Sequence, residues 1–158
     1  MFGETIYPID ELFTTTCRFR LMLVREEPEP YGPEMCASPA QAAPLLHRLV
    51  AGLDREVLGA LFLDTRHRAV GHTVAYIGTL NRTVAEPRGI LVPALLSNAA
   101  GVIVFHNHPS GDPSPSPEDL AFTRKLAEAS DAVGVRLVDH LILGDPPAFV
   151  SLKERGCW

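Results

Sequence analysis

The residues best suited to chemistry gather in one polar segment that follows an apolar run. His106 and His108 are separated by one residue and come directly after the apolar residues 102–105. Because side chains alternate along an extended strand, two histidines at this spacing project to the same side and can share one ion. A loop of the observed length could fold the carboxylate of Asp119 back toward them. Two imidazoles and one carboxylate are a familiar zinc set, whose fourth tetrahedral position holds water in catalytic sites. We therefore predict a catalytic zinc site.

The same segment also carries the signature of a helix start. Ser116 is followed by Pro117 and then by Asp119, the order typical of an N-cap, a first helical residue and a third helical residue. Taken alone, this pattern is typical of a capping pair. The histidines, taken alone, could be polar loop residues whose hydrogen bonds are satisfied by neighbours. The capping and metal roles are compatible, because Ser116 can cap the helix while Asp119 projects from its first turn. We expect a helix beginning at Pro117 with Asp119 facing the histidines.

Hydrophobic patterning around this segment predicts an α/β domain with a mixed sheet. We expect helices over residues 39–53, 87–96 and 117–132, and strands over 17–24, 56–64, 69–77, 101–105, 135–143 and 149–152. The strands 56–64 and 69–77 are expected to form a hairpin. Residues 1–36, an N-terminal strand with a Pro- and Glu-rich loop, are expected to belong to the same unit as residues 37–158.

Length and composition indicate a single globular domain. The chain has 158 residues, of which 46% are hydrophobic and 21% charged. The longest apolar stretches are far shorter than the roughly 20 residues that cross a bilayer, so we expect no membrane segment. The first residues do not read as a secretory signal, and we expect a cytoplasmic location.

Charge and cysteine content exclude further classes of protein. Fourteen basic and nineteen acidic residues give a formal net charge of −5, which argues against broad electrostatic attraction to phosphates. Direct nucleic-acid binding is therefore disfavoured. Cys17, Cys36 and Cys157 are an odd number without a close pair, which favours reduced thiols over a disulfide framework.

The pattern His-x-His-Pro followed by Ser-x-x-Asp resembles the JAMM or MPN-plus metalloprotease motif, and within that superfamily it looks like the RadC type. The resemblance extends from about Cys17 to the C-terminus and includes Leu63-Asp64-Thr65-Arg66, Gly78-Thr-Leu-Asn81, His106-Asn-His-Pro-Ser-Gly-Asp112, Asp139-His140 and Phe149-Val-Ser-Leu152. It implies a JAB/MPN-like mixed β-sheet flanked by helices. It also implies a zinc-dependent hydrolase of peptide or isopeptide bonds, with His106, His108 and Asp119 as ligands.

The resemblance further implies two catalytic residues. The family's upstream glutamate, a general base, corresponds to Glu56, and its serine, which stabilises the oxyanion, corresponds to Ser116. Glu86 is a rival for the base. RadC-type chains usually carry histidine at the Glu86 position and glutamate at the Gly89 position, and this sequence differs at both. For Glu56 to reach the histidines, its strand must run antiparallel to strand 101–105.

Eukaryotic relatives in this superfamily cleave ubiquitin-type isopeptide bonds. The resemblance therefore implies a protein or peptide substrate, including a ubiquitin-like or other carrier protein, without identifying it. A competing hypothesis is a DNA-repair-associated RadC-like protein, or a metal-containing scaffold without peptidase activity. The complete ligand set with a candidate base favours the enzyme. His140, in the predicted strand 135–143, is expected to be structural, with support of a metal ligand as the alternative.

Overall fold

The computed structural model describes residues 34–78 and 85–158, so the expected strand 17–24 lies outside the described residues. The described elements are, in chain order, α1 (Pro39–Leu49), β1 (Val57–Leu63), β2 (Ala69–Ile77), α2 (Pro87–Leu96), β3 (Gly101–Asn107), α3 (Pro117–Val133), β4 (Arg136–Leu143) and β5 (Phe149–Ser151). None of the helices in these two ranges is long and apolar enough to span a membrane.

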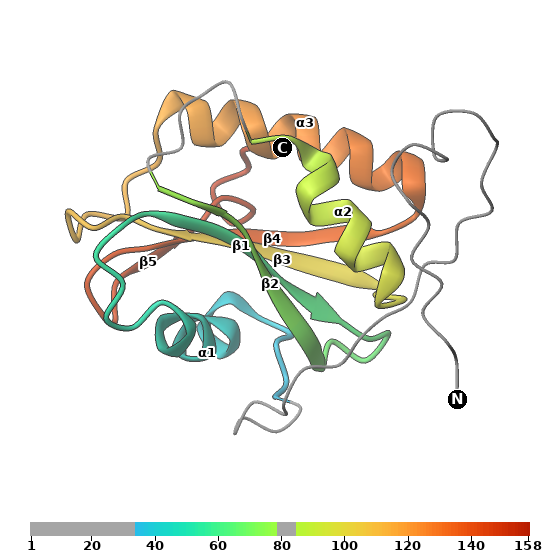
Figure 1. Cartoon of the computed structure of the whole chain (residues 1–158), viewed down its shortest axis with the longest axis horizontal. Coiled ribbons are helices and arrows are strands. Elements are labelled where there is room, and N and C mark those ends of the chain that lie inside the picture. The colour runs from blue at the N-terminus through green and yellow to red at the C-terminus, as the bar shows by residue number, and fades with distance from the viewer. Residues whose placement is uncertain (1–33, 79–84) are drawn as a thin grey trace, which may run out of the picture.

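The five strands form one mixed sheet in the order β2-β1-β3-β4-β5 (Figure 1). β1 is antiparallel to both β2 and β3. β3 is parallel to β4, and β5 pairs with β4 in the antiparallel sense. The predicted α/β class, the mixed sheet and the β1–β2 hairpin are therefore confirmed, and so is the antiparallel arrangement of β1 and β3.

Helices cover both faces of this sheet, with α1 on one side and α2 and α3 on the other (Figure 1). All seven residues of β1 and all seven of β3 are buried, as expected for central strands covered on two sides. Alternate positions pack into different cores. The core under α2 and α3 includes Leu58, Ala60, Phe62, Val102 and Val104, and the core under α1 includes Leu61, Leu63, Ile103 and Phe105.

Two element boundaries differ from the predicted ones in ways that matter. α1 ends at Leu49, four residues before the expected end, and the chain then turns through Gly52, whose φ of +75° suits a residue without a side chain. β3 extends beyond Phe105 because His106 is paired with Leu58 of β1 and Ile142 of β4. The first histidine therefore lies inside the strand, where backbone pairing on both sides holds it.

Gly59 allows β1 to lie tightly among its neighbours. A Cβ atom placed there would overlap the carbonyl oxygen of Thr73 in β2 and would lie 2.5 Å from Cζ of Phe105 in β3. Neither neighbour has room to retreat, because Thr73 contributes backbone and the Phe105 ring is fully buried.

We expect Gly59→Ala to destabilise the fold by about 1–3 kcal/mol, since overpacking a filled core displaces backbone and side chains. Urea unfolding followed by circular dichroism measures the change. Gly71→Ala in β2 is the matched control, because its Cβ would lie 3.7 Å from Cδ2 of Phe62, an ordinary contact. Equal stability of the Gly59→Ala and wild-type proteins would contradict the packing argument.

Candidate metal centre

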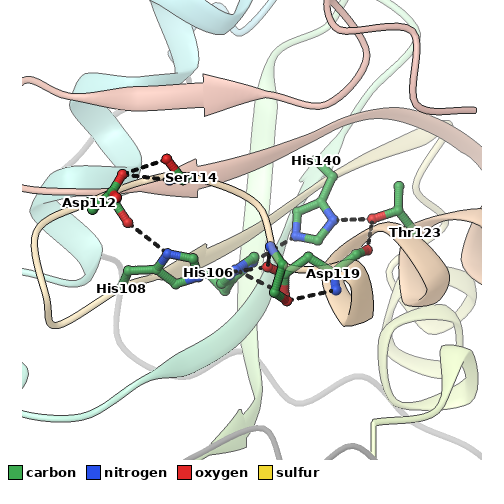
Figure 2. Close-up of polar contacts among 8 residues, drawn as sticks. His106, His108, Asp112, Ser114, Asp119, Thr123 and His140 are labelled. Carbon is green, nitrogen blue, oxygen red and sulfur yellow. Dashed lines mark hydrogen bonds and ion pairs between the residues drawn. The ribbon is translucent and has the colours of Figure 1, made fainter.

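His106 and His108 meet at the end of β3. His106 is fully buried on the side of the sheet covered by α2 and α3, and His108 follows the strand and is partly exposed. The backbone N–H of His108 donates to the carbonyl of Leu143 at 2.8 Å, which continues the pairing with β4 beyond the strand end. The two Nε2 atoms lie 3.0 Å apart (Figure 2). The expected convergence of the imidazoles is therefore observed.

A capping box at the start of α3 brings Asp119 to this histidine pair. Ser116 is the N-cap, and its Oγ accepts a hydrogen bond from the backbone N–H of Asp119 at 3.2 Å. In return, Oδ2 of Asp119 accepts from the backbone N–H of Ser116 at 2.7 Å. Oδ1 of Asp119 lies 3.3 Å from Nε2 of His106, and Oδ2 lies 3.8 Å from Nε2 of His108. The predicted helix start is confirmed, and Asp119 faces the histidines.

The Asp119 carboxylate is held in its charged form. Burial alone would raise its pKa, but contact with the His106 ring and hydrogen bonding to Ser116 hold the pKa well below its ordinary value. A buried carboxylate therefore places a negative charge beside two imidazole nitrogens, and such a site attracts a cation.

Glu56 reaches the same point from β1. The antiparallel register pairs Leu58 with His106, so Glu56, two residues before Leu58, arrives at the edge of the sheet where His108 lies. A carboxylate oxygen of Glu56 and one ring nitrogen from each histidine all lie within 4.8 Å of one another. Within the described ranges, Glu56, His106 and His108 thus form a group that could hold a metal ion, with Asp119 alongside it.

The rival glutamate has a different partner. Glu86 is the N-cap residue of α2, and its carboxylate oxygens accept hydrogen bonds from Nζ of Lys125 in α3 at 2.9 and 3.1 Å. Its backbone N–H and carbonyl both bind the hydroxyl of Tyr76. Glu86 is therefore engaged in an ion pair between two helices, whereas Glu56 lies among the imidazoles.

The donor set has the chemistry of a metal site. Nδ1 of His108 lies 2.8 Å from the backbone oxygen of Asp112. A carbonyl can only accept, so Nδ1 carries a hydrogen, and Nε2, on the side of His106, is the ring atom left for a metal. Two imidazole nitrogens with carboxylate oxygens beside them are the ligand types that zinc takes in proteins. The residues present fit the metal that the sequence predicts.

Asn107, the residue between the two histidines, has a structural role that the sequence analysis missed. Its Oδ1 accepts from the backbone N–H of Val57 at 2.9 Å, and its Nδ2 donates to the carbonyl of Arg55 at 3.1 Å. One side chain thus binds the backbone on both sides of Glu56. The only sequence signal was its position between the histidines, since alternation along the strand turns the Asn107 side chain to the opposite face from theirs.

His140 and Thr123 complete the surroundings of His106 (Figure 2). Nε2 of His140 in β4 lies 2.8 Å from Nδ1 of His106, and Nδ1 of His140 lies 2.6 Å from Oγ1 of Thr123 in α3. All three side chains are buried. Thr123 carried no sequence signal, because a threonine inside a predicted helix is unremarkable on its own.

We expect Asn107→Ala to destabilise the fold by about 1–3 kcal/mol, because the buried Val57 N–H loses its acceptor. Hydrogen exchange at the Val57 amide should accelerate, and urea unfolding gives the loss of stability. Arg55→Ala is the control, since it removes an exposed side chain but keeps the carbonyl that Asn107 binds. A Val57 amide that stays protected in Asn107→Ala would show that this clamp is not needed.

Comparison with known proteins agrees with the sequence resemblance. A family model described as the RadC-like JAB domain matches residues 36–157. A UPF0758 protein of Shouchella clausii is 46% identical over 120 residues, which cover 76% of this chain and 52% of that protein. A UPF0758 protein of Halorhodospira halophila is 48% identical over 125 residues, covering 79% and 55%. This chain spans about half the length of these curated relatives. The family match covers well over half of the chain, which therefore belongs to the RadC-like JAB domain family.

Proposed function

We propose that this chain is a zinc-dependent hydrolase of the JAMM type that cleaves a peptide or isopeptide bond by attack of water. The observation that carries the proposal is the convergence of two imidazoles and two carboxylates at the end of β3 in a RadC-like JAB domain. These groups come from the end of β3 and the residue after it, from the residue before β1 and from the first turn of α3. Such a meeting of polar side chains in a buried setting is typical of a catalytic centre.

In this proposal His106 and His108 hold zinc through their Nε2 atoms, and Asp119 supplies an oxygen ligand. Zinc, when bound, lowers the pKa of a coordinated water toward about 7 and polarises a carbonyl group. The ionised state of Asp119 suits this role, because only the carboxylate form is a ligand. The Ser116 N–H holds one oxygen of Asp119 in place while the other faces His106.

Glu56 and Ser116 would carry the remaining steps. Glu56 is partly exposed beside the histidines, where it takes a proton from the attacking water and returns it to the leaving amine. Oγ of Ser116 acts as acceptor toward the Asp119 N–H, so its own hydrogen remains to be donated. Donation to the developing oxyanion would stabilise the transition state, and a donor of this kind contributes about 3 kcal/mol in other hydrolases.

A cavity of about 230 Å³ beside the centre gives the substrate a place to bind. His106, Asp119 and His140 form part of its wall, and its apolar lining consists of Leu58, Ala85, Ala121 and Phe122. We propose that it receives an apolar side chain close to the scissile bond. The substrate would then be a protein or peptide, with a ubiquitin-like or other carrier protein among the options.

Glu56→Gln should retain one zinc per chain while losing at least about 100-fold in hydrolysis, because an amide preserves shape but cannot accept the proton. His106→Ala should lose the metal itself. Zinc content is measured by elemental analysis after dialysis. Hydrolysis is measured by mass spectrometry on a peptide library that includes lysine-linked isopeptides.

The alternatives give different results in the same assays. Stoichiometric zinc without cleavage of any peptide or isopeptide would favour a metal-containing scaffold. Salt-dependent binding to duplex DNA in place of cleavage would favour a DNA-repair role. Full activity in Glu56→Gln would move the base to another residue, and Glu86→Gln is the variant to compare.

Ala121→Phe should fill the cavity and raise KM at least about tenfold, with zinc content and stability unchanged, because Ala121 is exposed at the cavity wall. Steady-state kinetics on the best cleaved peptide measures this. Glu128→Phe, at an exposed position of α3 outside the cavity lining, is the control. An unchanged KM in Ala121→Phe would place the substrate elsewhere.

A further inference from the structure

A buried series of hydrogen bonds connects the backbone of α3 with the side of His106 that faces away from His108. Thr123 Oγ1 lies 2.6 Å from the carbonyl oxygen of Asp119 and 2.6 Å from Nδ1 of His140. Nε2 of His140 lies 2.8 Å from Nδ1 of His106. Thr123 and His106 are 0% exposed and His140 is 1% exposed, so water does not compete for these contacts.

The chemistry of each group sets the direction of these bonds. The Asp119 carbonyl can only accept, so the single hydroxyl hydrogen of Thr123 goes to it. This bond to the carbonyl four residues earlier is a common habit of threonine in helices. The oxygen of Thr123 is then left as an acceptor toward His140. Nδ1 of His140 must therefore carry a hydrogen, because two acceptors at 2.6 Å would repel each other.

The same reasoning continues to His106. A charged His140 ring would bury an ion at 1% exposure, which is costly, so the ring takes the neutral form with one hydrogen. With that hydrogen on Nδ1, Nε2 of His140 is an acceptor. Nδ1 of His106 must then be the donor in the 2.8 Å contact between the two rings. The Nε2 atom of His106 is left facing His108 and Asp119, where a metal would be held.

We propose that Thr123 and His140 are positioning residues that fix the ring orientation and the Nδ1–H tautomer of His106, so that its Nε2 lone pair is presented to zinc. The proposal rests on the metal site of the proposed function but does not require hydrolysis. Metal-ligating histidines commonly donate their other N–H to a partner that orients the ring. Here the partner is a neutral imidazole, itself oriented by a helix.

This arrangement gives α3 two connections to the metal. The carboxylate of Asp119 faces the histidines directly, while the backbone carbonyl of the same residue starts the hydrogen bonds that end at His106. A neutral partner also adds no further negative charge to a site that already holds two carboxylates. The orientation of His106 is thus set without altering the charge at the metal.

Nitrogen-15 NMR of the imidazole rings tests the tautomer in the zinc-loaded wild-type protein. We expect His106 and His140 each to show a hydrogen on Nδ1, with the His106 signal coupled across a hydrogen bond to His140. A His106 ring with hydrogen on Nε2 and a bare Nδ1 would overturn the proposal. This measurement needs neither a variant nor a substrate.

Zinc affinity in variants of Thr123 tests the consequence for the metal. Thr123→Val keeps the shape but removes the acceptor for His140, and it should weaken zinc binding about 10- to 100-fold in competition with a chelator. Thr123→Ser retains the hydroxyl and should restore affinity to within about threefold. Ser130→Ala is the matched control, because Ser130 is a buried hydroxyl of α3 whose Oγ has no hydrogen-bond partner among the described residues.

The outcomes separate this proposal from the proposed function. Wild-type zinc affinity in Thr123→Val would overturn the positioning role even if the protein cleaves peptides. Weakened affinity in Thr123→Val with rescue by Thr123→Ser supports it even if no peptide is cleaved. If Thr123→Val fails to fold, the tautomers of His106 and His140 in the zinc-loaded wild-type protein still decide the question.

Discussion

The antiparallel pairing of β1 with β3 is the constraint on which the rest of the centre depends. It sets Leu58 opposite His106, and the residues before Leu58 therefore reach the end of β3 where the histidines lie. A parallel pairing would place Glu56 at the opposite edge of the sheet. A shift of one residue would turn Glu56 to the other face. The Asn107 side chain reinforces this register at its end, since it binds the backbone on both sides of Glu56.

Because side chains alternate along a strand buried on both faces, three successive residues at the end of β3 make contacts on different sides. His106 and His108 serve the side covered by α3, and Asn107 serves β1. Polar groups in such a setting are costly unless each one is satisfied. The hydrogen bonds that connect the Asp119 carbonyl, Thr123, His140 and His106 satisfy these buried polar groups without water. The polar cluster is therefore compatible with a packed core on both faces of the sheet.

Features that depend on neighbours in the sequence could be predicted from it. The start of α3 at Pro117, with Ser116 as its cap, follows from residues within four positions, and α2 has the predicted bounds. The end of α1 was predicted too late, because apolar spacing continues beyond Leu49 although the chain turns at Gly52.

Contacts between distant residues could not be predicted without the register of the sheet. The antiparallel pairing of β1 and β3 was required by the family resemblance rather than by any local pattern. Asn107 and Thr123 were missed, since their partners lie about 50 and 17 positions away in the sequence. An asparagine at a strand end and a threonine inside a helix are both ordinary, so neither residue type gives a signal on its own. Their roles exist only because the folded chain brings those partners within hydrogen-bond distance.

The capping box at the start of α3 has a thermodynamic consequence. The same carboxylate of Asp119 closes the first helical turn and faces the histidines, so unwinding that turn and releasing an ion would be one event. Helix stability and metal affinity are then linked quantities, and each strengthens the other. A cap contributes about 1 kcal/mol to the stability of an exposed helix. Here the same interaction would also favour occupancy of the metal site. A local helix signal in this sequence would thereby also help to determine how tightly the centre holds a metal ion.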